Sequence, residues 1–430
     1  MRWTANYSTT SVASSPAPRA LSAAEGSGII RPDMDVAHCR VALDGRFLQQ
    51  PTTGSGQYSL HLWQALAATA DEPTTVLIRP DRPMPVDPLL GGDAAGATDT
   101  IRVPIPSWMR HDKVEKLWWE QRGLVRGARQ AGARLLHVPY FAGPRFTRLP
   151  LVITVHDVIP FIFPEYGGGR LMRLYLRLVS AVARRADAII TDSDCSRRDI
   201  TAWLGIPSER IHVIPLAVDP AIRPSDDPET AAALRARYGL PGPVIFNVGG
   251  LDARKNVPVL IEAFAQALPE LPPETRLVIA GRAHSGNQRL YPPLEPVIRR
   301  LGVEERVVLT GSITDEEKVA LYNLADLYVF PSLYEGFGLS PLEAMACGTP
   351  VIAANRSSLP EVVGQGGLLV DPTPERLAAA MVSVMRDERL RRSLARRALE
   401  QAETFSWQRT AELTRAVYRS VLASATPALA

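Results

Sequence analysis

The 430-residue sequence contains only three cysteines, Cys39, Cys195 and Cys347, and no two of them form a CxxC pair. This scarcity excludes a disulfide framework and a cysteine-rich metal site, and it predicts a reducing, cytoplasmic compartment. No uninterrupted apolar run approaches the roughly 20 residues that a membrane-spanning helix needs. A Walker loop is absent, and no GxGxxG follows a strand, so an ATP-hydrolysing P-loop is not predicted.

Acidic residues are scarce in one part of the chain. Between residues 101 and 186 there are 15 Lys or Arg and 5 Asp or Glu, a net charge of +10. The whole chain carries +3, so the remainder carries −7. This asymmetry indicates an anionic partner for the first half, or else an arginine-rich helix face in solvent.

The first 36 residues are rich in Ser, Ala and Pro and lack the charged-then-apolar order of a signal peptide. We expect residues 1–36 to form a disordered leader. Two DxD triplets occur, at 33–35 and 192–194. The first lies in the leader and the second resembles a helix cap, so no metal site is expected.

The rest of the chain alternates apolar runs with helical patterns, which predicts parallel sheets. A proline- and acid-rich stretch at 215–229 interrupts the alternation, which then resumes at 243. We therefore expect an α/β protein with two Rossmann-like, doubly wound domains that face each other across a cleft. The predicted domains are 37–220 and 221–404, with a helix at 405–425 that packs back on the first domain.

The stretch SLYEGFGLSPLEAMACGTPVIA, 332–353, carries two glutamates, Glu335 and Glu343, around a glycine loop and a helix start. Such a loop lies at the edge of an open α/β sheet where ligands bind, and a helix start favours an anion. Ser340 as N-cap with Glu343 at the third helical position would form a capping box. Spacing alone leaves Glu343 open between that structural role and a ligand contact.

Three further stretches place polar or bare backbone groups near the expected cleft. In GGLDARKN, Gly249 follows a strand, and Arg254 and Lys255 precede a helix, where two cations suit a diphosphate or merely face solvent. In GSGQY, Gly56 offers bare backbone before a helix expected near 57–70. His156, in TVHDVIPFIFPEY, ends a strand, as a packed residue or as a site residue.

Together with the late FSW at 405–407, these motifs make the chain resemble family 4 of the retaining glycosyltransferases, which have the GT-B fold. The resemblance covers residues 39–422, and the 332–353 stretch is similar to that family's E-x7-E motif. Within the family, the chain resembles bacterial mannosyltransferases that build O-antigen and related polysaccharides from GDP-mannose. One departure is Ser340, where the family often has proline.

The resemblance implies roles only at matching positions. Glu335 would contact the hydroxyls of the donor hexose, and Glu343 those of the ribose. His156 would lie near the transferred sugar. The residues expected at the donor phosphates, through side chain or backbone, are Arg254, Lys255, Gly56, Gly249, Phe337, Gly338 and Leu339.

The implied reaction is transfer of a hexose from a nucleotide sugar to a glycan or a polyprenyl-diphosphate-linked acceptor, with retention and without a metal or other cofactor. Nucleic acid is not an expected partner. A GT-B nucleotide-sugar epimerase and a nucleotide-sugar-binding regulatory module are the alternatives. Arg170, Arg173 and Arg177, with intervening leucines, and Trp118 with Trp119 also indicate a possible peripheral contact with an anionic membrane.

Overall fold

The computed structural model describes residues 39–51, 53–68, 74–81, 83–86, 100–106, 108–109, 112–282 and 287–425. All of them belong to one compact unit, 36–430. The leader expected at 1–36 and the DxD triplet at 33–35 lie outside the described residues.

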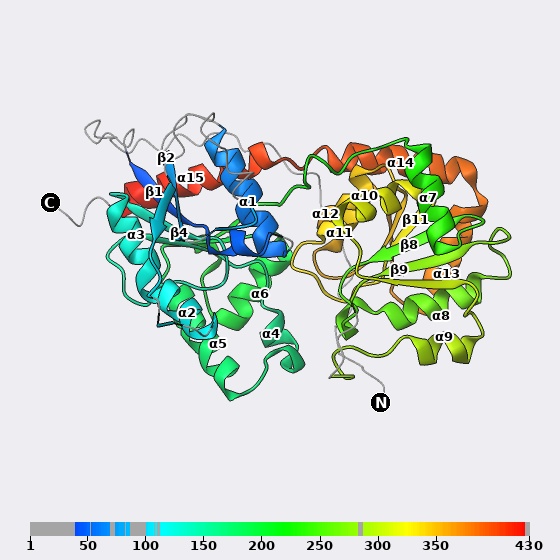
Figure 1. The fold of residues 1–430 in the computed structure, drawn as a ribbon, viewed down its shortest axis with the longest axis horizontal. Helices are drawn as coiled ribbons and strands as arrows, with labels where there is room; N and C mark the ends of the chain where they lie inside the picture. Colours follow the sequence, from blue (N-terminus) through cyan, green and yellow to red (C-terminus); the bar gives the residue numbers. More distant parts are fainter. Residues whose placement is uncertain are drawn as a thin grey trace. The chain divides into compact units, whose positions relative to one another are not determined.

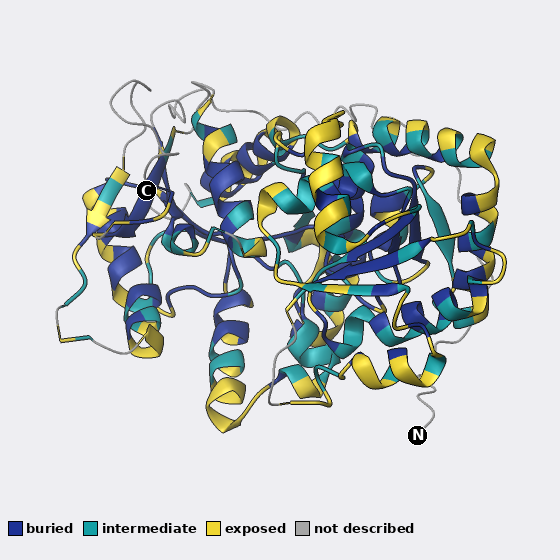
Figure 2. Ribbon diagram, turned by 45° about the vertical axis from the view of Figure 1, so that its right-hand side comes forward, coloured by how far each residue is buried: buried dark blue, intermediate teal, exposed yellow. Residues whose placement is uncertain are grey.

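Two wholly parallel sheets form the framework, and together they confirm the predicted α/β fold class. The first sheet has the order β3-β2-β1-β4-β5-β6-β7, from strands β1 (Arg40–Asp44), β2 (Thr74–Pro80), β3 (Thr100–Val103), β4 (Leu135–Val138), β5 (Leu151–Thr154), β6 (Ala188–Thr191) and β7 (Ile211–Val213). The second has the order β10-β9-β8-β11-β12-β13, from β8 (Val244–Val248), β9 (Arg276–Ala280), β10 (Val307–Gly311), β11 (Leu327–Phe330), β12 (Val351–Ala354) and β13 (Leu368–Val370). Most of these strands are buried (Figure 2), as continuous apolar runs in parallel sheets require.

Helices connect the strands of each sheet (Figure 1). The helices among the strands of the first sheet are α1 (Gly54–Ala67), α2 (Asp112–Trp118), a π-helical turn (Trp119–Gly123), α3 (Leu124–Gln130), α4 (Ile159–Ile162), α5 (Arg170–Ala183) and α6 (Asp194–Leu204). The second has α7 (Pro228–Tyr238), α8 (Val257–Ala267), α9 (Glu295–Leu301), α10 (Asp315–Leu324), α11 (Leu339–Ala346), α12 (Leu359–Val363), α13 (Pro374–Arg386) and α14 (Glu388–Ala402). The last helix is α15 (Trp407–Ala425).

Helix starts follow the local sequence where a polar side chain can cap them. Ser193 caps α6 by accepting from the Ser196 N–H, as expected for the second DxD triplet. Thr53 caps α1 by accepting from the Gly56 N–H. Because of this cap, α1 begins at Gly54, and GSGQY lies in its first turn rather than before it.

The expected capping box at Ser340 and Glu343 is wrong. Helix α11 begins two residues earlier, at Leu339, and its N-cap is Gly338, with φ of 116° and no side chain to cap with. A left-handed residue at this point turns the chain directly into the helix. Glu343 is therefore left free of the cap and bonds elsewhere, and the first N–H groups of α11 receive no side-chain cap.

Helix α15 returns to the first sheet, as predicted, and lies beside α1 in Figure 1. The Trp407 indole donates to the Val218 carbonyl, and Tyr418, fully buried, bonds to His137 Nδ1 over 2.7 Å. One cluster of buried apolar residues includes members of both sheets and of α15. The last helix is thus part of the core of the first half of the chain.

The expectation that Trp118 and Trp119 face a membrane is wrong for Trp119. Its side chain is fully buried and donates from Nε1 to Asp44 over 2.9 Å. Trp118 is half-buried and packs against the same core. These tryptophans hold the π-helical turn against β1. The exposed apolar side chains of this half therefore belong to other residues.

Replacing Tyr418 with Phe tests the anchor of α15. His137 is fully buried, and its other nitrogen, Nε2, bonds to Thr154 over 2.9 Å. Without the tyrosine hydroxyl, Nδ1 loses its partner, which costs about 1–3 kcal/mol for a buried polar group. We expect a clearly lower melting temperature by circular dichroism. Tyr238→Phe is the control, since its half-exposed hydroxyl can bond to water instead; equal losses in the two variants would contradict the anchor.

Candidate active site

The two motifs of the second half meet at the point where its strand order reverses. Strands β8 and β11 are neighbours there, although β9 and β10 lie between them in the chain. The loop after β8 carries 249–256, and the loop after β11 carries 331–338. Open α/β sheets bind ligands at such a switch point, outside the carboxyl ends of the strands.

Arg254, Lys255 and Glu335 form an ion triad at this point. Arg254 Nη1 lies 2.9 Å from Glu335 Oε2, and Lys255 Nζ lies 2.7 Å from Glu335 Oε1. The Ser332 hydroxyl donates to Glu335 Oε1 over 2.6 Å. Asp252 Oδ1 lies 3.4 Å from Arg254 Nε. Two cations therefore face two carboxylates.

The charged forms of Glu335 and Arg254 favour each other. Burial favours the neutral acid, but Lys255 and Arg254 hold the pKa of Glu335 below its ordinary value. Burial likewise lowers the pKa of Arg254, and the Glu335 and Asp252 carboxylates raise it by more. Arg254 Nε is buried and makes no hydrogen bond with the described residues. Its charge partner is the Asp252 carboxylate, at 3.4 Å.

Glu343 bonds to two side chains of α10. Lys318 Nζ lies 2.9 Å from Glu343 Oε1, and the Tyr322 hydroxyl donates to Glu343 Oε2 over 2.9 Å. Burial raises the pKa of Glu343, although Lys318 and Tyr322 oppose this. The carboxylate is 7% exposed and lies in the wall of a cavity of about 1000 Å³.

That cavity is lined by residues from both halves of the chain. Gly249, Leu339 and Glu343 contribute from the second half, and Gly54 and Tyr58 from α1. Arg254, Lys255, Glu335 and His156 are not among its lining residues. Gly249 has a φ of 151°, in the region that favours glycine, and a Cβ there would approach the Lys255 side chain at 3.9 Å. Gly249 therefore lies both in the cavity wall and next to the ion triad.

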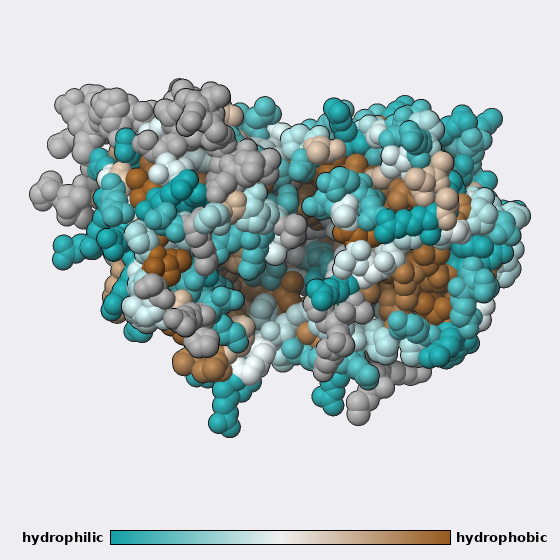
Figure 3. Space-filling model, in the orientation of Figure 1, coloured by the Kyte–Doolittle hydropathy of each residue, from teal (hydrophilic) through white to brown (hydrophobic). Residues whose placement is uncertain are grey.

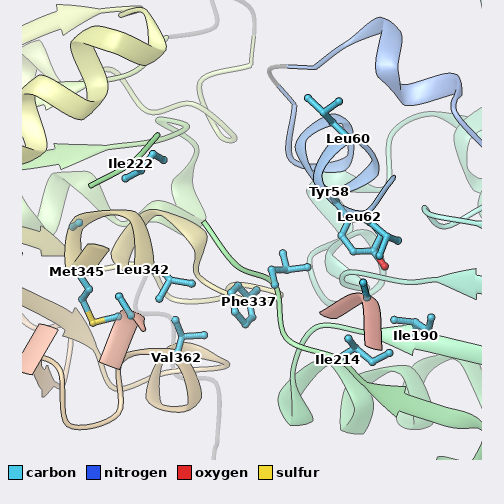
Figure 4. Packing of buried hydrophobic residues seen from close by; sticks show 14 of the residues in the cluster. Tyr58, Leu60, Leu62, Ile190, Ile214, Ile222, Phe337, Leu342, Met345 and Val362 are labelled. Carbon is cyan, nitrogen blue, oxygen red and sulfur yellow. The ribbon is translucent and has the colours of Figure 1, made fainter. Parts of the chain in front are cut away.

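The loop 336–338 turns the Phe337 side chain into the core, and the backbone contacts of 337–339 with the donor stay a prediction. Phe337 is 6% exposed, and its ring lies 5.8 Å from that of Phe405. Figure 4 shows Phe337 with Leu342 and Val362 on one side and Tyr58 on the other. The uncapped start of α11 lies next in the chain, where Leu339 lines the cavity.

His156, two residues beyond β5, pairs with Asp192 at the end of β6. His156 Nδ1 lies 2.8 Å from Asp192 Oδ2, and the Tyr58 ring packs edge-on at 4.8 Å. Burial lowers the pKa of His156, but the Asp192 carboxylate raises it by more, so it lies above the ordinary value. His156 Nε2 is buried without a hydrogen-bond partner among the described residues.

Gly336 brings the two halves of the site into contact. Its carbonyl accepts from the Ser193 hydroxyl over 2.7 Å and from the Ser196 hydroxyl over 3.0 Å. A Cβ at Gly336 would lie 2.5 Å from the His156 carbonyl oxygen. In addition, Glu361 of α12 accepts from the first two N–H groups of α6, at 2.7 and 2.8 Å. Glu335 and His156 are therefore held on adjoining loops.

Gly56 has a local structural reason to be glycine. A Cβ there would lie 2.0 Å from the Gln50 carbonyl oxygen, and its N–H is bonded to Thr53. The close neighbour of Gly56 is thus the chain's own loop. Its predicted contact with the donor phosphates stays a prediction.

The sequence reasoning did not find Asp192, Lys318 and Tyr322 as members of the site. Asp192 has a signal, since it ends a strand that follows the strand of His156 in the alternation. Lys318 and Tyr322 stand four residues apart on α10 and face Glu343, and only the packing of α10 against α11 brings them there.

Within the described part of the chain, no group of three or more His, Cys, Asp or Glu side chains is placed to hold a metal ion. Nor does any helix in the part that the structure describes have both the length and the apolar character needed to cross a membrane.

Family models match both halves of the chain. The model described as glycosyl transferases group 1 matches residues 233–401, and that of glycosyltransferase family 4 matches 52–222. The O-antigen chain mannosyltransferase B of Escherichia coli is 31% identical over 86% of this chain and 97% of its own length. The chain belongs to the family 4 glycosyltransferases.

A second relative is larger. The serotype-specific mannosyltransferase WbdA of Escherichia coli is 35% identical over 61% of this chain, but the match spans only 32% of WbdA. The chain thus matches about a third of the length of that relative.

Solved structures share the fold. The sucrose-phosphate synthase of Thermosynechococcus elongatus has a TM-score of 0.68 and 24% identity, covering 90% of this chain and 100% of its own. Anabaena HepE, solved with UDP and glucose, has a TM-score of 0.64 and 22% identity, covering 89% and 100%. These neighbours have the GT-B fold, and the present chain has it too.

Replacing Gly336 with Ala tests the contact between the loops. The added Cβ meets a backbone carbonyl, which cannot move aside as a flexible side chain can. The loop must shift, and a displacement of about 1 Å at such a site can cost on the order of 100-fold in rate. We expect kcat/KM to fall by about that factor while the far-ultraviolet circular dichroism stays unchanged.

Gly169→Ala is the matched control, because a Cβ at Gly169 has nothing within 4 Å. Its kcat/KM with a soluble acceptor should stay within about twofold of the unmodified protein. Full activity of Gly336→Ala would show that the approach of the two loops is not needed.

Proposed function

We propose that this chain transfers mannose from GDP-mannose to a hydroxyl of a glycan or lipid-linked acceptor, with retention of the anomeric configuration and without a metal. Membership of the glycosyltransferase family gives the reaction class. The choice of mannose as the sugar and of GDP as the nucleotide rests on the names of the relatives and on the sequence resemblance. The names of two relatives specify a mannosyltransferase.

The observation that carries the proposal is the ion triad beside the cavity. A nucleotide sugar has a diphosphate between a ribose and a hexose, so it needs cations between two sets of hydroxyl acceptors. Arg254 and Lys255 supply the cations, Glu343 lies in the cavity wall, and Glu335 is paired with both cations. We assign the ribose to Glu343 and the hexose to Glu335.

The same arrangement suits the charge that develops during transfer. The bond between the anomeric carbon and the phosphate oxygen breaks, and negative charge gathers on the diphosphate. Arg254, Lys255 and the uncapped N–H groups of α11 stabilise that charge without a metal. The acceptor hydroxyl forms the new bond on the same face, and its proton passes to the leaving diphosphate. Glu335 orients the sugar in this scheme.

His156 is the proposed contact of the first half with the transferred sugar. Asp192 accepts from Nδ1–H, and this leaves Nε2, the nitrogen without a partner, to meet a sugar hydroxyl. The predicted division follows, with 37–220 on the acceptor side and 221–404 holding the donor. An acceptor linked to a membrane lipid would require the first half to approach a membrane surface.

A donor screen tests the proposed function. Purified protein is incubated with GDP-mannose and with other GDP-, UDP- and ADP-sugars, and nucleoside diphosphate release is followed. We expect turnover to be highest with GDP-mannose and to persist in EDTA, because fixed cations replace the metal. Loss in EDTA with recovery in Mn²⁺ would overturn metal independence. Product with an epimerised sugar, or tight binding without turnover, would overturn transfer.

The two sides of the Arg254–Glu335 pair separate a ligand role from a structural one. Arg254→Ala removes a charge-assisted bond to the diphosphate, worth roughly 1.5–3 kcal/mol, so GDP should bind about 10–150-fold more weakly by calorimetry. Glu335→Gln breaks the same ion pair but leaves the cations in place. It should bind GDP at least as tightly as the unmodified protein and yet turn over the donor slowly.

Glu343→Gln is the third arm and should weaken GDP binding because the ribose contact is lost. Melting temperatures of all three variants control for loss of fold. Equal GDP affinities of Arg254→Ala and Glu335→Gln would mean that the pair is only structural.

A further inference from the structure

The first turns of α5 expose large apolar side chains. Leu171 is 82% exposed, Leu174 63% and Met172 46%. In Figure 3, hydrophobic atoms appear at the lower left, at the level where α5 begins in Figure 1, with hydrophilic groups beside them. The second half of the helix packs inward, since Val179 and Val182 are each 2% exposed. The beginning of α5 therefore carries apolar surface that the described residues do not cover.

A cavity of about 440 Å³ lies along the same helix, away from the donor cavity. Three arginines line it, Arg173, Arg177 and Arg184, with the buried Ser180 between them. The three arginines and Ser180 are spaced by four, three and four residues, so they share one face of α5 and its C-cap. Phe161, from the neighbouring α4, is among the apolar residues that complete the lining.

Within the described part of the chain, these arginines have no counter-charge. Arg173 donates to the Gly168 carbonyl and Arg184 Nε to the Leu204 carbonyl, and neither bond neutralises a guanidinium. Among the described residues, Arg173, Arg177 and Arg184 form no ion pair with a carboxylate, and no Asp or Glu lines the cavity. Two backbone carbonyls therefore orient the cations while their charge remains available.

We propose that this cavity binds the phosphate group of an anionic membrane lipid. Arginine forks match phosphate oxygens, and three of them around one cavity suit a phosphate monoester or diester better than a carboxylate. The exposed Leu171, Met172 and Leu174 enter the boundary between headgroups and acyl chains beside it.

A membrane lipid explains both features, whereas a soluble phosphate explains only the arginines. A soluble ligand would leave three large apolar side chains on the adjoining turns in water. A lipid places its phosphate in the cavity and its acyl chains next to these side chains. The inference rests on the proposed function only in that a lipid-linked acceptor gives membrane contact a purpose.

The test is sedimentation of the full chain with vesicles of phosphatidylcholine alone or with one-fifth phosphatidylglycerol. We expect binding only with the anionic lipid, and weaker binding at high salt because screening reduces the attraction. Arg173→Ser with Arg177→Ser should weaken it about 30-fold, since each arginine near the surface contributes roughly 1 kcal/mol. Leu171→Ser with Leu174→Ser should weaken it by at least tenfold.

The matched control is Arg392→Ser with Arg396→Ser on α14. It removes the same charge from exposed positions that lie outside the cavity. Its vesicle binding should stay within about threefold of the unmodified chain. Donor turnover with a soluble acceptor should be unchanged in the Arg173 and Arg177 double variant, so failure of the lipid site and failure of the proposed function are distinguishable.

Calorimetry with glycerol 1-phosphate and with inorganic phosphate separates the two sources of phosphate. Both should bind far more weakly than anionic vesicles. If they bind as tightly, and the leucine variant binds vesicles normally, the cavity is a site for a soluble phosphate. If the unmodified chain stays in the supernatant with anionic vesicles at low salt, or if the arginine variant binds like its control, the proposal is wrong.

Discussion

The carbonyl of Gly336 is the contact on which the candidate site depends. Two serine hydroxyls of the first half donate to it, and the missing side chain lets the loop reach the backbone of His156. Glu335 precedes this glycine, and the start of α11 follows it by three residues. The contact at Gly336 therefore determines where the Glu335 carboxylate and the first N–H groups of α11 lie, although neither group takes part in it. A change at this point would disturb both together.

The ion triad adds an electrostatic constraint. Glu335 pairs with both Arg254 and Lys255, and so it offsets the repulsion between the two cations. A diphosphate at the basic pair would compete with Glu335 for the same donors. On the proposed function, the arrival of the donor loosens the hold on the carboxylate just where a sugar hydroxyl would bind it. The same ion pairs thus hold the two cations in position and make the Glu335 carboxylate respond to the donor.

The sequence predicted most of the framework because parallel strands are continuous apolar runs. LYVF and PVIFNV, for example, became neighbouring strands, and the return of the last helix to the first sheet was also predicted. The errors were local. The Ser340 cap failed because Gly338 can adopt a left-handed conformation and start the helix earlier. Trp119 was misjudged because charge nearby in the sequence says nothing of which way a side chain points.

The sequence could not predict which side chains of different elements would pair. Asp192 was interpreted as part of a DxD triplet, and its pairing with His156 follows from two strands lying side by side. Lys318 belongs to Glu343 only because α10 packs on α11. Glu361 lies more than 160 residues from the helix start that it caps. Such pairings need the tertiary fold, and no spacing rule within one element contains them.

The path of α15 has a consequence for how the protein is made. Tyr418 and His137 are 281 residues apart, and Arg415 bonds to the Leu66 carbonyl 349 residues away. The core of the first half stays incomplete until α15 has left the ribosome. Contacts of such long sequence separation slow folding and leave apolar surface exposed meanwhile. The first half therefore completes its core only after the strands of the second half have been synthesised, although its own strands are made first.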